Sequence, residues 1–173
     1  MPPAELFEAY DHYYATLAHE LSHWTGHSSR LDRELKSENS VAISVEDRAA
    51  LENLSREGWW QLPDIREPMR EPMLRAAAWY FLRARTPRGT PVDSVARFHL
   101  GNGARLERLN FLGDANENGI KQSYGLMVNY LYDLDHIEEN HEAFAGARTV
   151  VAASAVKRHL RKSAATDLVP MSG

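Results

Sequence analysis

The chain has 173 residues, 43% hydrophobic and 25% charged, which fits one folded domain with an appendage and excludes long disorder. A net charge of −4 gives no global attraction to nucleic acid, and the absence of cysteine excludes disulfides and thiolate chemistry. Because no apolar stretch is long enough to span a membrane and the N-terminus lacks a signal-peptide pattern, we expect a cytoplasmic protein with no membrane or nucleic-acid partner.

Three helices are predicted in the first half of the chain. Apolar residues recur at spacings of three and four over residues 4–22 and again over 69–85. Between them, Ser44 and Asp47 have capping-box spacing and open a helix that ends near Gly58. The intervening "SSRLDRELKSENS" is predicted to be a linker, and "WWQLPDIREP" an irregular connection.

The second half combines predicted strands and helices. "SVARFHL" and "ARLERLNFLG" read as two strands of a β-hairpin, because the intervening "GNG" contains the Asn-Gly turn signal. A helix is predicted after them, and its apolar positions are Ile120, Tyr124, Met127, Val128, Leu131 and Leu134. "HIEENHEAF" predicts a further short helix, and Ser154 is the expected cap of the last one, before a frayed tail at 163–173. This order of elements predicts an α+β fold.

The N-terminal "HELSH" has the spacing of a zinc site. On a helix His19 and His23 would share a face, and Glu20 would take a proton from a zinc-bound water. A catalytic zinc needs a third protein ligand. Gly26 fits one known continuation of the motif, but Ser29 stands where that pattern has its third histidine.

The surrounding "YYATLAHELSHWTGHSSRLDRE" resembles the zincin-like region of ArdC-type antirestriction proteins over about residues 8–36. The resemblance implies a partial zincin-like helical leader at 1–40 and a zinc-dependent metallopeptidase or antirestriction remnant as one function. The alternative is a leftover helix with solvated histidines.

The residues of the central block do not by themselves point to catalysis. His99, on the predicted strand, has the ordinary interpretation of a structural hydrogen-bonding residue. Asn129 and Tyr132 are three positions apart on the predicted helix and would share a face, with Tyr132 in the core.

Three runs in this block nevertheless closely resemble the C-terminal region of malonyl-CoA decarboxylases: "FHLGNGA" at 98–104, "RLN" at 108–110 and "GLMVNYLY" at 125–132. With the flanking "VEDRAALENLSREGWW" and "VAASAVKRHL", the resemblance covers about residues 43–162. It implies a partial domain with a fold like the GNAT acetyltransferases, containing the hairpin and its flanking helices.

The resemblance also implies a reaction and a site. The reaction is that of a lyase, from malonyl-CoA to acetyl-CoA and carbon dioxide, with a CoA thioester as substrate and no cofactor. The family's catalytic histidine falls on His99, with Tyr132 beside it. The implied substrate-binding residues are Asn110, Asn129 and Tyr130.

The sequence departs from the family at one point that matters for catalysis. It has no segment of the Ser-Pro-Ile-Pro-Gly-Phe type, in which the family carries a catalytic serine, and Ser44 is better explained as a helix cap. We therefore expect a fusion or truncated product. An incomplete sheet has exposed edges, which favours a homo-oligomer or a complementing fragment as partner. A non-catalytic CoA-binding fragment is the remaining alternative.

Overall fold

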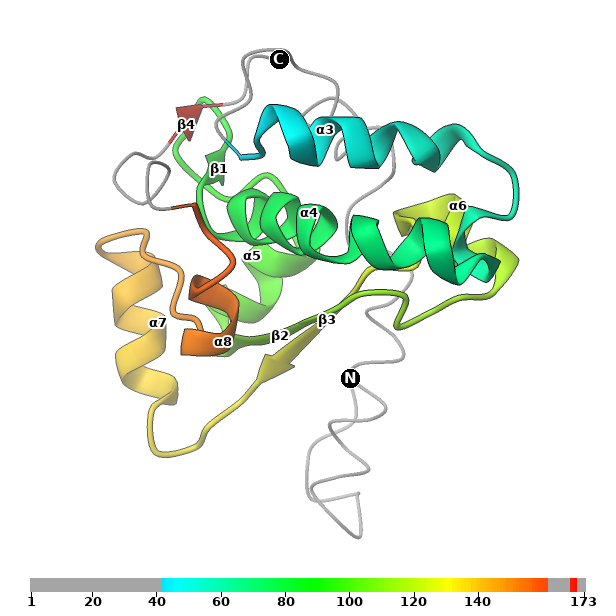
Figure 1. Ribbon diagram of the computed structural model, residues 1–173. Coiled ribbons are helices and arrows are strands. Elements are labelled where there is room, and N and C mark those ends of the chain that lie inside the picture. The colour runs from blue at the N-terminus through cyan, green and yellow to red at the C-terminus, as the bar shows by residue number, and fades with distance from the viewer. Residues whose placement is uncertain (1–41, 162–168, 171–173) are drawn as a thin grey trace, which may run out of the picture.

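The computed structural model describes residues 42–161 and 169–170. The helix expected over residues 4–22 and most of the tail lie outside them. In chain order the elements are α3 (Val45–Leu51), the 3-10 turns η2 (Glu52–Ser55) and η3 (Trp59–Gln61), α4 (Pro63–Leu82), β1 (Ala84–Arg85), α5 (Ser94–Gly101), β2 (Arg105–Asn110), α6 (Glu117–Ser123), β3 (Met127–Leu131), α7 (Ile137–Ala145), α8 (Ser154–Lys157) and β4 (Val169–Pro170) (Figure 1). No helix of this part of the chain is long and apolar enough to cross a membrane.

The predicted capping box at the start of α3 is confirmed. The Ser44 hydroxyl accepts a hydrogen bond from the Asp47 backbone N–H at 3.1 Å, and the Asp47 carboxylate accepts one from the Ser44 N–H at 3.0 Å. The same carboxylate accepts two hydrogen bonds from the Arg75 guanidinium of α4, at 2.6 and 2.9 Å. Asp47 therefore both starts α3 and ties it to α4, which runs alongside (Figure 1).

Helix α4 is the central element of the core. Every residue from Ala76 to Leu82 is buried, so the C-terminal part of the helix is covered on all sides. Met69 and Met73, nearer its N-terminus, are fully buried as well. The helix begins at Pro63, within the stretch predicted to be irregular, so that prediction was wrong. The reason is that proline fits the first position of a helix, where its missing N–H and fixed φ cost nothing.

The predicted strand over "SVARFHL" is wrong, because these residues form helix α5. Asp93 caps its first turn by accepting a hydrogen bond from the Ala96 N–H at 2.7 Å. The "GNG" sequence ends the helix instead of turning a hairpin: Gly103 has φ +82°, and the Ala104 N–H returns to the His99 carbonyl at 3.0 Å. Asn-Gly thus acts here as a helix C-terminal signal.

The predicted strand over "ARLERLNFLG" is confirmed as β2, but its partner is β3 and not residues 94–100. The two strands are antiparallel, with Leu106 opposite Tyr130 and Leu109 opposite Val128, and α6 connects them. The helix predicted through residues 120–134 is therefore wrong beyond α6. Tyr124 and Gly125 both have positive φ, at 55° and 74°, which stops the helix and starts the strand.

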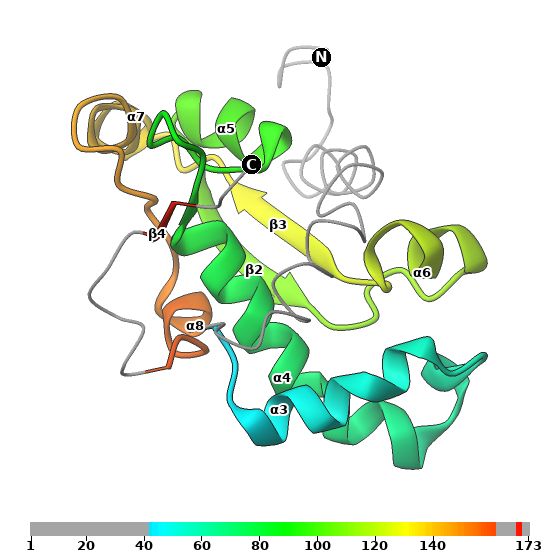
Figure 2. The ribbon, with the colours of Figure 1, turned by 90° about the horizontal axis from the view of Figure 1, so that it is seen from above.

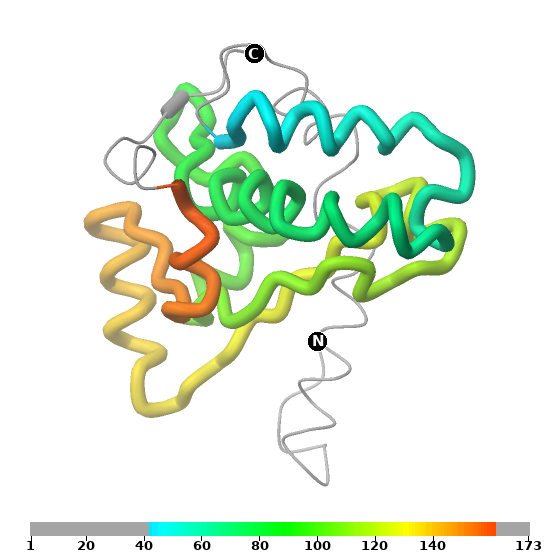
Figure 3. Tube along the Cα trace, viewed as in Figure 1, coloured from blue at the N-terminus to red at the C-terminus, as the bar shows by residue number. Residues whose placement is uncertain are grey.

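The later elements pack around this sheet. Helix α7 is confirmed over "HIEENHEAF" and lies beside α5 at one end of the molecule (Figure 2). The segment after α7 returns to β2 (Figure 3), where the Leu106 N–H donates to the Val151 carbonyl at 2.9 Å. Helix α8 is four residues long and is preceded by Ala153, so Ser154 begins it and does not cap it as predicted.

Candidate active site

His99 lies in the last turn of α5 and is only 1% exposed. Its Nδ1 atom is 2.7 Å from the hydroxyl oxygen of Tyr132, which follows β3 directly. The imidazole also stacks on the Tyr130 ring, with 4.8 Å between centroids and 17° between planes. The structure thus brings His99, Tyr130 and Tyr132 together.

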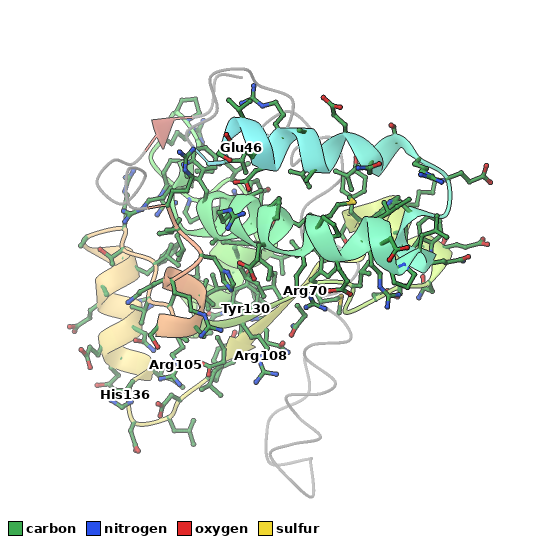
Figure 4. All side chains as sticks on the ribbon, in the orientation of Figure 1. Glu46, Arg70, Arg105, Arg108, Tyr130 and His136 are labelled. Atoms are coloured by element: carbon green, nitrogen blue, oxygen red, sulfur yellow. The ribbon has the colours of Figure 1, made fainter. Side chains whose placement is uncertain are left out.

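The two tyrosines contact the histidine differently because Tyr130 lies within β3 and Tyr132 lies just after it. Tyr130 is a buried residue of β3 and points to the side of the sheet that α4 covers, whereas Arg108 of β2 is exposed on the far side (Figure 4). Tyr132 comes just past the end of the strand and is partly exposed. The prediction that Asn129 and Tyr132 share a helix face is wrong, since neither residue is in a helix.

Burial determines the charge state of the cluster. It lowers the pKa of His99 to about 4, so the imidazole is neutral near pH 7. Burial, followed by the charge of Asp93 and the phenols of Tyr80 and Tyr132, raises the pKa of Tyr130 well above its ordinary value. The His99 imidazole and the Tyr130 phenol are therefore both neutral at physiological pH.

The hydrogen bond at Nδ1 has a consequence for the other ring nitrogen of His99. When the Tyr132 hydroxyl donates to Nδ1, the proton of the neutral imidazole is on Nε2, which becomes a donor. Because the imidazole is almost completely covered, a ligand can reach that nitrogen only after neighbouring side chains move.

Helix α7 holds the end of α5 in place through two side chains that no sequence pattern singled out. The buried Asn140 side chain donates to the Gly103 carbonyl at 3.1 Å, and His141 Nδ1 donates to the Gly101 carbonyl at 2.7 Å. Contact is so close that a Cβ atom on Gly103 would lie 2.4 Å from the Ile137 carbonyl oxygen. The carbonyl groups that end α5 are thereby given fixed partners.

Asn110 and Asn129 form a separate pair. The Asn110 side-chain amide donates to the Asn129 side-chain oxygen at 2.6 Å, across β2 and β3. Because neighbouring residues of a strand point to opposite faces, Asn129 faces away from the side on which Tyr130 stacks against His99. The structure does not bring this pair together with the histidine, and the substrate-binding role implied for both asparagines stays a prediction.

The metal hypothesis falls outside what the structure describes. His19, Glu20 and His23 all precede residue 42. Among residues 42–161 and 169–170, no three or more histidine, aspartate or glutamate side chains lie close enough to hold a metal ion.

Comparison with known proteins agrees with the central block. A family model described as the malonyl-CoA decarboxylase C-terminal domain matches residues 12–169. The chain belongs to this family. A solved malonyl-CoA decarboxylase from Rhodopseudomonas palustris is 48% identical with a TM-score of 0.75, over 80% of this chain and 32% of that one. The mitochondrial malonyl-CoA decarboxylase of Anser anser anser is 37% identical over 103 residues, 60% of this chain and 20% of that protein.

Two further facts bound the comparison. The chain spans about a fifth of the length of the curated decarboxylases that it matches, and about a third of the solved one. A different relative, the DNA primase TraC of Escherichia coli, is 60% identical over 35 residues, 20% of this chain and 2% of that protein. The division into a leader at 1–40 and a decarboxylase region at 43–162 stays a prediction.

Proposed function

We propose that this chain acts on malonyl-CoA and releases acetyl-CoA and carbon dioxide, with His99 as the catalytic residue and Tyr132 as the residue that orients it. The single observation that carries the proposal is the 2.7 Å contact between His99 Nδ1 and the Tyr132 hydroxyl, in a fold of the malonyl-CoA decarboxylase family. The whole reaction is a proposal because the chain corresponds to only part of its relatives.

The chemistry needs a hydrogen-bond donor more than it needs a charge. When the bond between the carboxylate carbon and the α-carbon breaks, its electron pair moves into the thioester and forms an enolate. The Nε2–H of His99 would donate to the enolate oxygen, with Tyr132 fixing the tautomer from the other side. Carbon dioxide leaves in that step, and the enolate then takes a proton from a water molecule at its α-carbon as the thioester carbonyl re-forms, which gives acetyl-CoA.

The burial of His99 suits that role. A neutral imidazole with a pKa of about 4 keeps its Nε2 proton across the physiological range. At a buried site the same hydrogen bond stabilises the developing charge more strongly than it would in solution. No step in this scheme uses a cofactor, and we propose that none is needed. Activity that persists after treatment with a chelator would support this, and its loss would return attention to His19 and His23.

The decisive experiment incubates the purified chain with malonyl-CoA and measures the acetyl-CoA released by chromatography of the CoA esters. We expect release by the wild type and at least a hundredfold less by His99→Gln. The matched control is His159→Gln, because His159 is also well covered but lies 3.4 Å from Glu71, outside the cluster. A wild type that releases no acetyl-CoA overturns the proposal. So does equal loss in the two variants.

Finer expectations remain proposals at this stage. We propose that the α+β arrangement is part of a GNAT-like domain. The similar solved structures are malonyl-CoA decarboxylases, so this proposal rests on the family resemblance. We also propose a cytoplasmic location, although the curated relative from Anser anser anser is a mitochondrial protein. For Asn110, Asn129 and Tyr130 we propose the substrate-binding role that the family resemblance implies, with the Asn110–Asn129 pair in contact with a portion of CoA remote from the thioester.

A further inference from the structure

The main-chain carbonyl of His99 accepts hydrogen bonds from two peptide groups, and α7, which lies beside α5 (Figure 2), holds both of them. The first peptide group joins Gly101 to Asn102. Its N–H donates to the His99 oxygen at 3.1 Å, and its carbonyl accepts a hydrogen bond from His141 Nδ1 at 2.7 Å. Because a peptide group is planar and rigid, a bond that fixes its carbonyl also fixes its N–H. His141 therefore acts on His99 through a single peptide plane.

The second peptide group joins Gly103 to Ala104 and is held in the same way. Its N–H donates to the His99 oxygen at 3.0 Å, and its carbonyl accepts a hydrogen bond from the Asn140 side-chain amide at 3.1 Å. Asn140 is only 6% exposed, so this bond is stronger than it would be in water. Two neighbouring side chains of α7 thus fix both donors to one carbonyl, and that carbonyl belongs to His99.

The same helix is attached to the hydrogen-bond partner of the imidazole. Tyr132 is followed by Asp133, whose carbonyl accepts from the His136 N–H at 3.0 Å, and the His136 carbonyl accepts from the Asn140 N–H at 2.9 Å. A continuous series of bonds therefore runs from Tyr132 through Asn140 to His99. The 2.7 Å contact between the Tyr132 hydroxyl and His99 Nδ1 closes this series into a ring.

We propose that Asn140 and His141 are positioning residues for His99. They fix the backbone from which the imidazole extends, and so keep Nδ1 within hydrogen-bond distance of Tyr132. Without that contact the ring proton is free to occupy Nδ1, and Nε2 then no longer donates. The consequence for catalysis rests on the proposed function, whereas the consequence for the imidazole does not.

The nitrogen resonances of the His99 ring test the positioning without any measurement of activity. The Nδ1 and Nε2 shifts of a neutral imidazole are well separated when one tautomer dominates, and they approach each other when the two tautomers mix. We would record them at neutral pH and identify His99 by its absence from His99→Gln. We expect a single Nε2–H tautomer in the wild type. The two shifts should approach each other in Asn140→Ala and in His141→Ala.

Ser123→Ala is the matched control. The buried Ser123 hydroxyl also donates to main-chain carbonyls, those of Gly119 at 3.2 Å and Leu126 at 3.1 Å, but these belong to α6 and the turn after it. This variant should leave the His99 resonances unchanged. An equal change in the control overturns the proposal, and so do unchanged resonances in the α7 variants that fold. Because His141 is exposed, His141→Ala carries the test should Asn140→Ala fail to fold.

A double-mutant cycle on acetyl-CoA release tests the consequence for catalysis. Asn140→Ala should lower kcat at least about tenfold and leave KM within about twofold, because it displaces His99 and not the substrate. In a Tyr132→Phe background, where the contact is already lost, the same change should cost less than about twofold. Equal factors in the two backgrounds overturn the positioning role. A wild type that releases no acetyl-CoA overturns the proposed function instead, and the His99 resonances then decide the positioning.

Discussion

Tyr132 and Tyr130 flank the same imidazole but differ in what their hydroxyl groups do. The Tyr132 oxygen lies 2.7 Å from His99 Nδ1, whereas the Tyr130 hydroxyl, although its ring stacks on His99, has no hydrogen-bond partner within residues 42–161 and 169–170. The Tyr132 hydroxyl thus provides the hydrogen bond that His99 Nδ1 needs, whereas the Tyr130 hydroxyl is buried without a hydrogen bond to the described residues. Two single-atom deletions therefore separate these cases.

Tyr132→Phe should destabilise the protein by about 1–3 kcal/mol, because it leaves His99 Nδ1 buried without a partner. Tyr130→Phe removes a hydroxyl that has no described partner, so it should be neutral or slightly stabilising. Urea unfolding of the two variants and the wild type measures both effects. Equal losses of stability would contradict the assigned contacts.

Stability should fall on mild acidification because of His99. Its pKa is lowered to about 4 in the folded protein and is near 6.5 when the chain unfolds, so between these values the unfolded state binds the extra proton. The stability contributed by the neutral imidazole is complete above pH 6.5 and declines as the pH falls toward 4, by roughly 3 kcal/mol in total.

Unfolding curves at several pH values between 7 and 4 measure this slope. His99→Gln supplies the control, because it removes the titrating group and should flatten the profile in that window. A wild type and a variant with parallel profiles would exclude His99 as the source.

The ion pair between Asp47 and Arg75 gives a third and separate prediction. Burial alone would raise the pKa of Asp47, but hydrogen bonds from Arg75 and the Ser44 backbone and the Arg75 charge outweigh it, and the pKa lies below its ordinary value. The resulting stability is present above the unfolded pKa near 4 and is lost as the pH falls through the lower folded value.

Asp47→Asn should cost about 1–3 kcal/mol at pH 7, since it removes a charge-assisted pair from a mostly buried site. Glu71→Gln is the control, because Glu71 is exposed and lies 3.9 Å from the same arginine. Thermal unfolding should show a clear loss for the first variant and almost none for the second.

Gly103 should tolerate no side chain. It has φ +82°, and a Cβ atom there would lie 2.4 Å from the Ile137 carbonyl oxygen. Gly58 has a similar φ of +68° but open space around it, so Gly58→Ala should cost only about 1–2 kcal/mol for the backbone conformation. Gly103→Ala should cost measurably more in denaturant unfolding, and the difference between the two isolates the α5–α7 contact.

The sequence was informative where one local signal dominated. The capping box of Ser44 and Asp47, strand β2 and helix α7 were predicted correctly. Helix α5 was not predicted because its eight residues are too few for a clear helical period and its only other signal is the single capping residue Asp93. Strand β3 was not predicted because tyrosine rarely adopts a positive φ, so the sequence does not show that α6 ends at Tyr124.

The site was predictable in its members but not in its arrangement. Similarity to the family singled out His99 and Tyr132, which the structure joins by a hydrogen bond. No local pattern pointed to Asn140 or His141, because each binds a backbone carbonyl that any residue would offer. The contact between Asn110 and Asn129 depends on the register of β2 and β3. It could not be predicted because residues 120–134 were expected to form a helix and not a strand.

The route of the chain around β2 bears on the order of folding. Strand β2 needs β3 on one edge and residues 151–153 on the other, and α5 needs α7, so the ring partners of His99 and the segments that hold its helix are made after it. We therefore expect the imidazole to be fully covered only after these segments have docked. Contacts between distant segments also form slowly. Because a protonated imidazole resists burial, refolding should slow as the pH falls below about 6.5.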